Sequence, residues 1–140
     1  MLFRTYVINP ATNKIVHTIT GIEAPLFIVC DDKIPRCFAT DWNYGTVTPS
    51  SPTKLTVGTP VKQCNRNPEF LAFNPVNGEV YVTNINSNPP TVTVIKGTAV
   101  VKTVHLNAVY RAVWMRLKLA DTDILERHFS EQDKRKKKSN

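Results

Sequence analysis

The stretch that decides the fold reads FNPVNGEVYVTN and occupies residues 73–84. Phe73 ends a short apolar run, and residues 79–84 alternate between two kinds of side chain, which is typical of a β-strand. Between them, Asn74-Pro75 and Asn77-Gly78 are turn dipeptides. The Asn-Gly pair predicts the positive φ angles that a tight hairpin requires. The stretch therefore predicts two antiparallel strands joined by a short turn.

This hairpin belongs to a repeat. Residues Pro25–Asp41 align with Pro68–Asn84 without a gap, at an offset of 43 residues. Further matches extend the repeat on both sides: Thr46–Thr48 with Thr91–Thr93, and Ile15–Ile19 with Val100–Val104. Each copy predicts four short strands in about 43 residues, the size of one β-propeller blade. We therefore predict an all-β fold, an incomplete β-propeller of four-stranded antiparallel blades with a C-terminal helical tail.

The domain organisation follows from the same alignment. Blades are predicted near residues 25–61 and 68–104, with partial blades at 1–22 and 107–113, so the repeats occupy residues 1–113. Residues 114–140 are predicted to form a helical, basic tail. Neither Pro nor Gly occurs after Gly97, and the apolar residues from Val113 onward fall near three- and four-residue spacing.

The length of the chain conflicts with the predicted architecture. A closed propeller uses about 4 to 8 blades, more than 140 residues can supply at this spacing. Two interpretations are open. Either the helical tail packs on the last blade and covers its edge, or the chain is a fragment of a longer propeller protein whose reading frame was lost near Val113. The abrupt end of the repeat favours the second, and uncovered blade faces predict an oligomeric, aggregated or poorly folded chain.

The string Tyr81-Val82-Thr83-Asn84, with the turn before it and the strand Thr91–Ile95 after it, resembles the YVTN-family β-propeller repeat. Residues 7–16 are similar to the connection between the third and fourth strands of that repeat, and Ala39–Asn43 is a degenerate copy. The resemblance covers roughly residues 5–113 and implies a propeller fold. Many proteins with such repeats are large surface-layer or extracellular proteins without an assigned reaction, so the resemblance implies an extracellular or cell-surface location. The N-terminal residues lack the apolar run of a secretory signal, so the localisation stays open.

Residues that could carry chemistry are few. Cys30, Cys37 and Cys64 do not have the spacing of a zinc or redox motif. Cys30 and Cys37 align with strand positions of the repeat, which favours buried free thiols over a Cys30–Cys37 hairpin disulfide, and the odd count argues against a secreted disulfide framework. The histidines are scattered, and no glycine-rich phosphate loop is present. We therefore predict no catalytic residue, no metal site and no cofactor.

Two loops of the repeat form a candidate binding surface. Trp42, Asn43 and Tyr44 follow the second predicted strand of one copy, and Asn86 and Asn88 follow that of the other. In propellers, loops at one end of the blades line the binding surface, where an exposed Trp and Tyr suit a ligand or partner. For Trp42 itself, packing between neighbouring blades is the favoured interpretation.

The strongest electrostatic feature lies at the end of the chain. The net charge is +7, and residues 111–140 carry more than half of it. The basic run consists of Lys134, Arg135, Lys136, Lys137 and Lys138. Such a run can bind nucleic-acid phosphates or an anionic membrane surface, although a solvated tail is the favoured interpretation. No stretch of about 20 apolar residues occurs, which excludes a transmembrane helix.

The leading functional hypothesis is a non-catalytic interaction or structural module that binds a protein partner, or itself, through exposed blade faces. One alternative is binding of nucleic acid or an anionic surface through the basic tail. Another is a remnant of a propeller enzyme, because similar propellers include lactonases and haem d1-binding proteins. Those proteins build their sites at the central channel from several blades, and two blades cannot supply such a ring.

Overall fold

The computed structural model describes residues 4–31, 33–62, 64, 67–84 and 86–106. Within these ranges the chain forms strands and turns and contains no helix, which confirms the prediction of an all-β, antiparallel fold. Residues 107–113, predicted as a partial blade, and residues 114–140, predicted as a helical tail, lie outside the described residues. In the part of the chain that is described, no helix is long and apolar enough to span a membrane.

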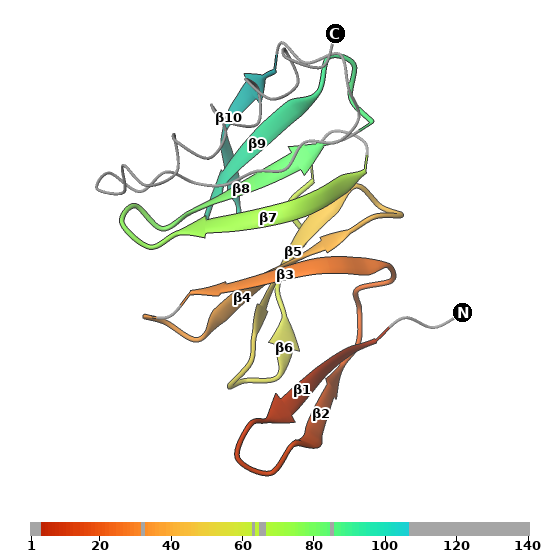
Figure 1. Ribbon diagram of the computed structural model, residues 1–140, viewed down its shortest axis with the longest axis vertical. Helices are drawn as coiled ribbons and strands as arrows, with labels where there is room; N and C mark the ends of the chain where they lie inside the picture. The colour runs from red at the N-terminus through yellow and green to blue at the C-terminus, as the bar shows by residue number, and fades with distance from the viewer. Residues whose placement is uncertain (1–3, 32, 63, 65–66, 85, 107–140) are drawn as a thin grey trace, which may run out of the picture.

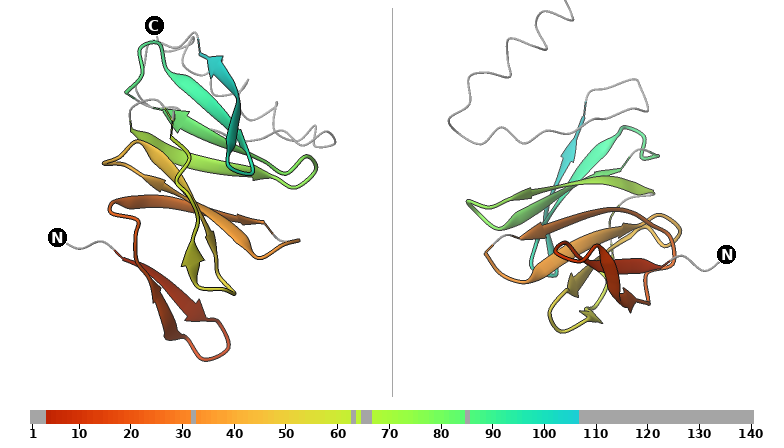
Figure 2. Two further views of the ribbon diagram at one scale, coloured as in Figure 1. Left: turned by 180° about the vertical axis from the view of Figure 1, so that it is seen from behind. Right: turned by 60° about the horizontal axis from the view of Figure 1, so that its bottom comes forward.

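The described strands form three separate antiparallel sheets, which follow one another in chain order along the longest axis of the structure (Figure 1). The first is a hairpin of β1 (Thr5–Asn9) and β2 (Lys14–Ile19). The next, called sheet A, has the order β3 (Pro25–Asp31), β4 (Arg36–Asp41), β5 (Thr46–Ser51) and β6 (Thr56–Val57). The last, called sheet B, has the order β7 (Pro68–Asn74), β8 (Glu79–Asn84), β9 (Thr91–Lys96) and β10 (Ala99–His105). Strand β7 of sheet B lies against β3 and β4 of sheet A, and the further views show the same stacking (Figure 2).

The two sheets share an irregularity at equivalent positions. The register shifts between Pro25 and Ile28 in β3, and between Pro68 and Leu71 in β7. Two residues of the first strand therefore oppose one residue of the second, which is the arrangement of a β-bulge. A bulge leaves a backbone N–H without a ladder partner, and a threonine side chain supplies the missing acceptor in both sheets.

In sheet A the N–H of Phe27 donates to Oγ1 of Thr40 at 3.0 Å, and in sheet B the N–H of Phe70 donates to Oγ1 of Thr83 at 3.1 Å. Thr40 also donates to the carbonyl of Glu69 at 3.3 Å, which links sheet A to sheet B. The equivalent rings of Phe27 and Phe70 meet edge to face, with centroids 5.2 Å apart. The spacing that the two copies share thus places the same bulge and the same hydroxyl in each sheet.

One detail of the predicted β7–β8 turn is wrong, because only one residue of the Asn77-Gly78 pair has a positive φ. Asn74 pairs with Glu79, so the β7–β8 turn contains the four residues 75–78, which lie where the sequence predicts a turn. Gly78 has a φ of 71° and its N–H donates to the carbonyl of Asn74, whereas Asn77 does not have a positive φ. The side chain of Asn77 instead accepts from the N–H of Glu79 at 3.0 Å. A four-residue turn needs only its last residue in the left-handed region, and Gly78 meets that need.

A single apolar cluster holds the two sheets together. Its fully or almost fully buried members come from sheet A and the segment after it, and from sheet B: Phe38, Val47, Val61, Cys64, Leu71, Val80, Val82 and Ile95. Phe38, on β4, has no exposed surface. Because the cluster draws on both sheets, neither sheet is expected to retain its packing when the other is lost.

The expectation of buried free thiols is wrong for Cys30 and Cys37, which form a disulfide. The two residues are directly opposite each other in the β3–β4 register, the geometry that brings cross-strand Cβ atoms within reach of a disulfide. The sequence alignment placed both positions on strands but did not give the register between them, so it could not show that they face one another. Cys64 is a buried free cysteine, as expected.

We expect reduction of this disulfide to lower the free energy of unfolding by about 2–3 kcal/mol, because the cross-link restricts the unfolded chain over a short loop. The measurement is urea unfolding followed by circular dichroism, with and without dithiothreitol. A Cys30→Ser/Cys37→Ser variant serves as the control. Its free energy of unfolding should equal that of the reduced protein and should not change when dithiothreitol is added. Equal stability of the oxidised and reduced proteins would contradict the cross-link.

Candidate functional site

The two loops predicted as a binding surface lie next to each other, joined by a residue that the sequence did not single out. Asn67 donates from Nδ2 to the carbonyl of Trp42 at 3.5 Å, and its Oδ1 accepts from Nδ2 of Asn86 at 2.9 Å. Asn67 has a φ of 61°, a left-handed conformation that asparagine tolerates better than most residues. The bridge therefore connects the loop after β4 with the loop after β8.

Of the five residues predicted to form the binding surface, Trp42 is partly buried and the other four are exposed. Trp42 is half-buried, and its backbone N–H donates to the backbone carbonyl of Ala24. Asn43 and Tyr44 are exposed, and Tyr44 has 63% of its surface accessible. Asn86 and Asn88 are exposed in the loop after β8. The structure thus brings Trp42 and Asn86 together through Asn67, with Asn43 and Tyr44 continuing directly from Trp42.

One signal in the sequence could have pointed to Asn67. In the alignment of the two copies its equivalent is Ala24. Because the other copy has alanine at this position, the fold itself does not require a polar side chain there, and a polar residue indicates another role. The contact across the loops, however, depends on how sheet A and sheet B are placed, which a periodicity does not contain.

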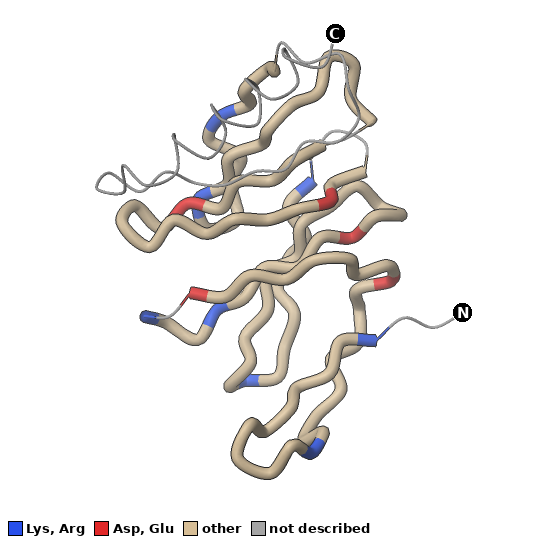
Figure 3. The backbone as a smooth tube through the Cα atoms, in the orientation of Figure 1, with Lys and Arg blue, Asp and Glu red and all other residues tan. Residues whose placement is uncertain are grey.

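A pocket of about 520 Å³ opens beside this surface and is called the Asp41 pocket. Asp41, at the end of β4, is 3% exposed. Its Oδ2 accepts from the N–H of Glu23 at 2.8 Å, and its Oδ1 accepts from the N–H groups of Asn43 and Tyr44 at 3.1 and 3.3 Å. The carboxylate therefore holds the segment before β3 against the β4–β5 turn. Acidic positions lie at this end of the sheets and also at the opposite end (Figure 3).

The repeat explains why this pocket is polar. The residue equivalent to Asp41 in sheet B is Asn84, whose Nδ2 donates to the hydroxyls of Thr91 and Thr93 at 3.1 and 2.9 Å. The Asp41 side chain has no N–H group that could donate to Thr46 and Thr48, the residues that correspond to Thr91 and Thr93. Thr46 and Thr48 both line the pocket. Replacement of asparagine by aspartate thus leaves two threonine hydroxyls beside a carboxylate at a cavity wall.

Other side chains of the pocket extend its hydrogen-bonding capacity. A hydrogen bond to the Glu23 carboxylate, with the repulsion of that charge, raises the pKa of Tyr44. Lys62 contributes one ammonium group. Burial raises the pKa of Cys64 to about 12, and a protonated thiol is neither a nucleophile nor a metal ligand. The lining therefore suits a polar ligand that both donates and accepts hydrogen bonds.

A second candidate surface is apolar. Ile8 and Ile15 are paired opposite each other on the β1–β2 hairpin and are 57% and 59% exposed. Tyr6 and Val16, on the same hairpin, are 50% and 57% exposed. Four large apolar side chains on one small hairpin exceed the scattered exposure that is normal on protein surfaces. We call these four residues the hairpin patch.

The remaining predictions are not all addressed by the described residues. Lys134, Arg135, Lys136, Lys137 and Lys138 lie outside them. Within the described ranges, no group of three or more His, Cys, Asp and Glu side chains has an arrangement that could hold a metal ion. No protein-family model matches the sequence, and no curated protein matches it.

Proposed function

We propose that the protein is a non-catalytic module of β-propeller-type repeats that associates with other repeat sheets, including those of a second copy of itself, through the hairpin patch. The repeat part of the proposal is supported by the equivalence of sheet A and sheet B. Both have four antiparallel strands in sequential order, and both have a bulge satisfied by a threonine, Thr40 or Thr83. These are the residues on which the resemblance to YVTN repeats depends.

The observation that carries the interaction is the difference between the hairpin and the two sheets. Ile15–Ile19 aligns with Val100–Val104 of β10, so β1 and β2 correspond to β9 and β10, the last two strands of sheet B. Sheet A and sheet B bury the apolar residues of their middle strands against each other. The hairpin patch has no such cover among the described residues, and a further repeat sheet is the surface with matching spacing and chemistry.

We expect the purified chain to self-associate in a concentration-dependent way, because burial of apolar surface drives association. Size-exclusion chromatography with light scattering measures this directly. The double variant Ile8→Lys/Ile15→Lys should shift the mass towards the 15.8 kDa of one chain. The two lysine ammonium groups would have to lose water for the contact to form, which disfavours association. Val76→Lys, at a turn residue that is 82% exposed, is the matched control and should leave the mass of the assembly unchanged.

Two results would count against this proposal. A wild-type protein that elutes as a single chain at all concentrations would remove the basis for self-association. A wild-type assembly that persists in the Ile8→Lys/Ile15→Lys variant would show that another surface mediates it.

The Cys30–Cys37 disulfide supports a place outside the reducing cytosol for this module. Structural disulfides persist mainly in oxidising compartments, and Cys37 is 5% exposed. This agrees with the extracellular or cell-surface location that the resemblance to YVTN repeats implies.

A further inference from the structure

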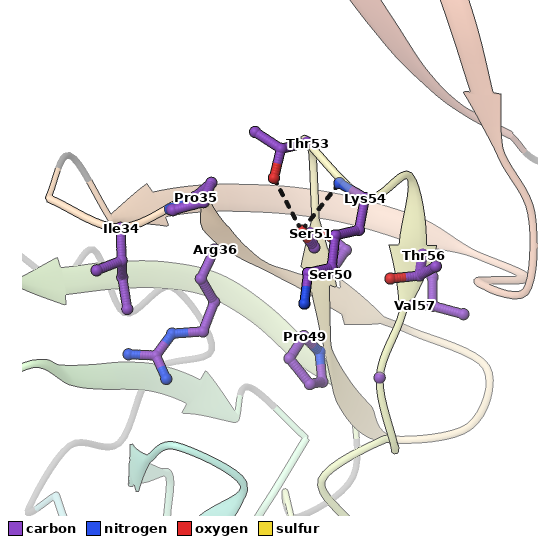
Figure 4. A pocket seen from close by; sticks show the side chains of 11 residues that line it. Ile34, Pro35, Arg36, Pro49, Ser50, Ser51, Thr53, Lys54, Thr56 and Val57 are labelled. Carbon is purple, nitrogen blue, oxygen red and sulfur yellow. Dashed lines mark hydrogen bonds between the residues drawn. The ribbon is translucent and has the colours of Figure 1, made fainter.

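A second pocket lies at the opposite end of sheet A from the Asp41 pocket. It has a volume of about 350 Å³ and is formed by the β3–β4 turn, the end of β5 and the β5–β6 turn (Figure 4). We call it the Arg36 pocket. Among the described residues of its lining, the charged ones are Arg36 and Lys54, and none carries a carboxylate. The described lining of this pocket is therefore basic.

Arg36 is held in place by interactions that leave part of its guanidinium unused. Its carbon Cζ lies 5.2 Å from the centre of the Phe38 ring, and one Nη is 3.8 Å from the carboxylate of Asp31. The Arg36 side chain is 33% exposed. Its buried Nε–H has no hydrogen-bond partner among the described residues. Because Nε is buried, a ligand in the pocket can reach only the exposed remainder of the Arg36 side chain.

The second cation reaches the pocket from the facing turn. Figure 4 shows the side chain of Lys54 folded back across Ser50 and Ser51 towards Pro49. The Lys54 backbone N–H donates to Oγ of Ser51 at 3.2 Å, which fixes the turn that carries the ammonium group. Asp31, outside the lining, offsets one of the two positive charges, so the described residues around the pocket leave one positive charge without a counter-ion.

Hydroxyl groups complete the lining. They belong to Ser50, Ser51, Thr53 and Thr56. Oγ of Ser51 accepts from the Lys54 N–H and lies 3.3 Å from Oγ1 of Thr53. Because that acceptor role is filled, the Ser51 proton is available to donate, either to Thr53 or to a ligand.

From this lining we propose that the Arg36 pocket binds a phosphate or sulfate ester carried on an apolar body. The two cations and the hydroxyl donors suit the three terminal oxygens of an ester of phosphate or sulfate, which accept more hydrogen bonds than the two oxygens of a carboxylate. Ile34, Pro35 and Val57 form an apolar wall beside them, which suits the body of the ligand. This site is separate from the hairpin patch and from the Asp41 pocket.

The test is a titration of the full-length protein with phenyl phosphate, phenyl sulfate, benzoate and phenol, followed by ¹H–¹⁵N NMR. We expect the amide signals of Ser50, Ser51 and Lys54 to shift with phenyl phosphate or phenyl sulfate, with clearly weaker binding of benzoate and none of phenol. The preferred ester identifies the anion. Affinity should fall as salt is added, because exposed charges are screened.

Three variants locate the site. Lys54→Gln is expected to weaken ester binding about tenfold, the loss of one charge-assisted hydrogen bond. Arg36→Lys keeps the charge but removes the planar fork, and it should also weaken binding. Lys102→Gln, an exposed position on β10 of sheet B, removes the same charge elsewhere and should bind as the wild type does. Equal affinities in all three variants, or binding of phenol as tight as that of the esters, would overturn the proposal.

Discussion

Replacement of Phe38 by alanine is expected to lower the free energy of unfolding by about 3–5 kcal/mol, the usual cost of removing a fully buried aromatic ring. Phe38 has no exposed surface and belongs to the apolar cluster shared by sheet A and sheet B. Its ring is also the platform on which the Arg36 guanidinium lies. Since small domains are stable by only about 5–15 kcal/mol, this one substitution should remove a large part of the total.

Urea unfolding, followed by circular dichroism and by tryptophan fluorescence at one fixed protein concentration, measures the loss. The concentration is held fixed because association would itself change the apparent stability. Both signals should move together to lower urea, since the cluster spans the two sheets. Val76→Ala, at a position 82% exposed, is the control and should change stability by no more than about 0.5 kcal/mol. A loss below about 1 kcal/mol for Phe38→Ala would mean that the ring is not packed as described.

The strands and turns that could be predicted from the sequence are those that local residue patterns specify and that occur in both copies of the repeat. Alternating residues 79–84 and the turn before them specify a hairpin without reference to the rest of the chain. The alignment then carried the same elements to the second copy, and the strands Arg36–Asp41 and Glu79–Asn84 occur at the predicted offset. A threonine before the Asp or Asn has a clear role in each sheet, because its hydroxyl satisfies the bulge.

What could not be predicted depends on contacts between elements. The Cys30–Cys37 disulfide requires the β3–β4 register, and the Asn67 bridge requires the placement of one loop on another. The Arg36 pocket combines a β3–β4 turn with a β5–β6 turn, although Arg36 and Lys54 are far apart in the sequence and belong to no motif. Loop residues such as Trp42 were identified because they follow strands, but nothing in the sequence revealed the pocket beside them.

Asp41 is the residue for which structural and binding roles can be separated by experiment. Three backbone N–H groups, those of Glu23, Asn43 and Tyr44, donate to its carboxylate. Asp41→Ala leaves these donors without their acceptor, and hydrogen bonds to a charged group contribute about 1.5–3 kcal/mol each. Water that enters the adjoining pocket can replace part of the loss. We therefore expect Asp41→Ala to lower the free energy of unfolding by about 3–4 kcal/mol, measured by urea unfolding.

Asp41→Asn provides the sharper comparison, because asparagine occupies the equivalent position in sheet B. The amide oxygen would still accept from Asn43 and Tyr44, and the new N–H₂ could donate to Thr46 and Thr48, as Asn84 does to Thr91 and Thr93. The same N–H₂ would oppose the N–H of Glu23, so one interaction is lost and others are gained. We expect a smaller loss of about 1–2 kcal/mol. If Asp41→Asn is as damaging as Asp41→Ala, the charge and not the acceptor geometry stabilises the turn. If neither variant is destabilised, the carboxylate is not needed for folding, and its place in the wall of the Asp41 pocket would point to ligand binding.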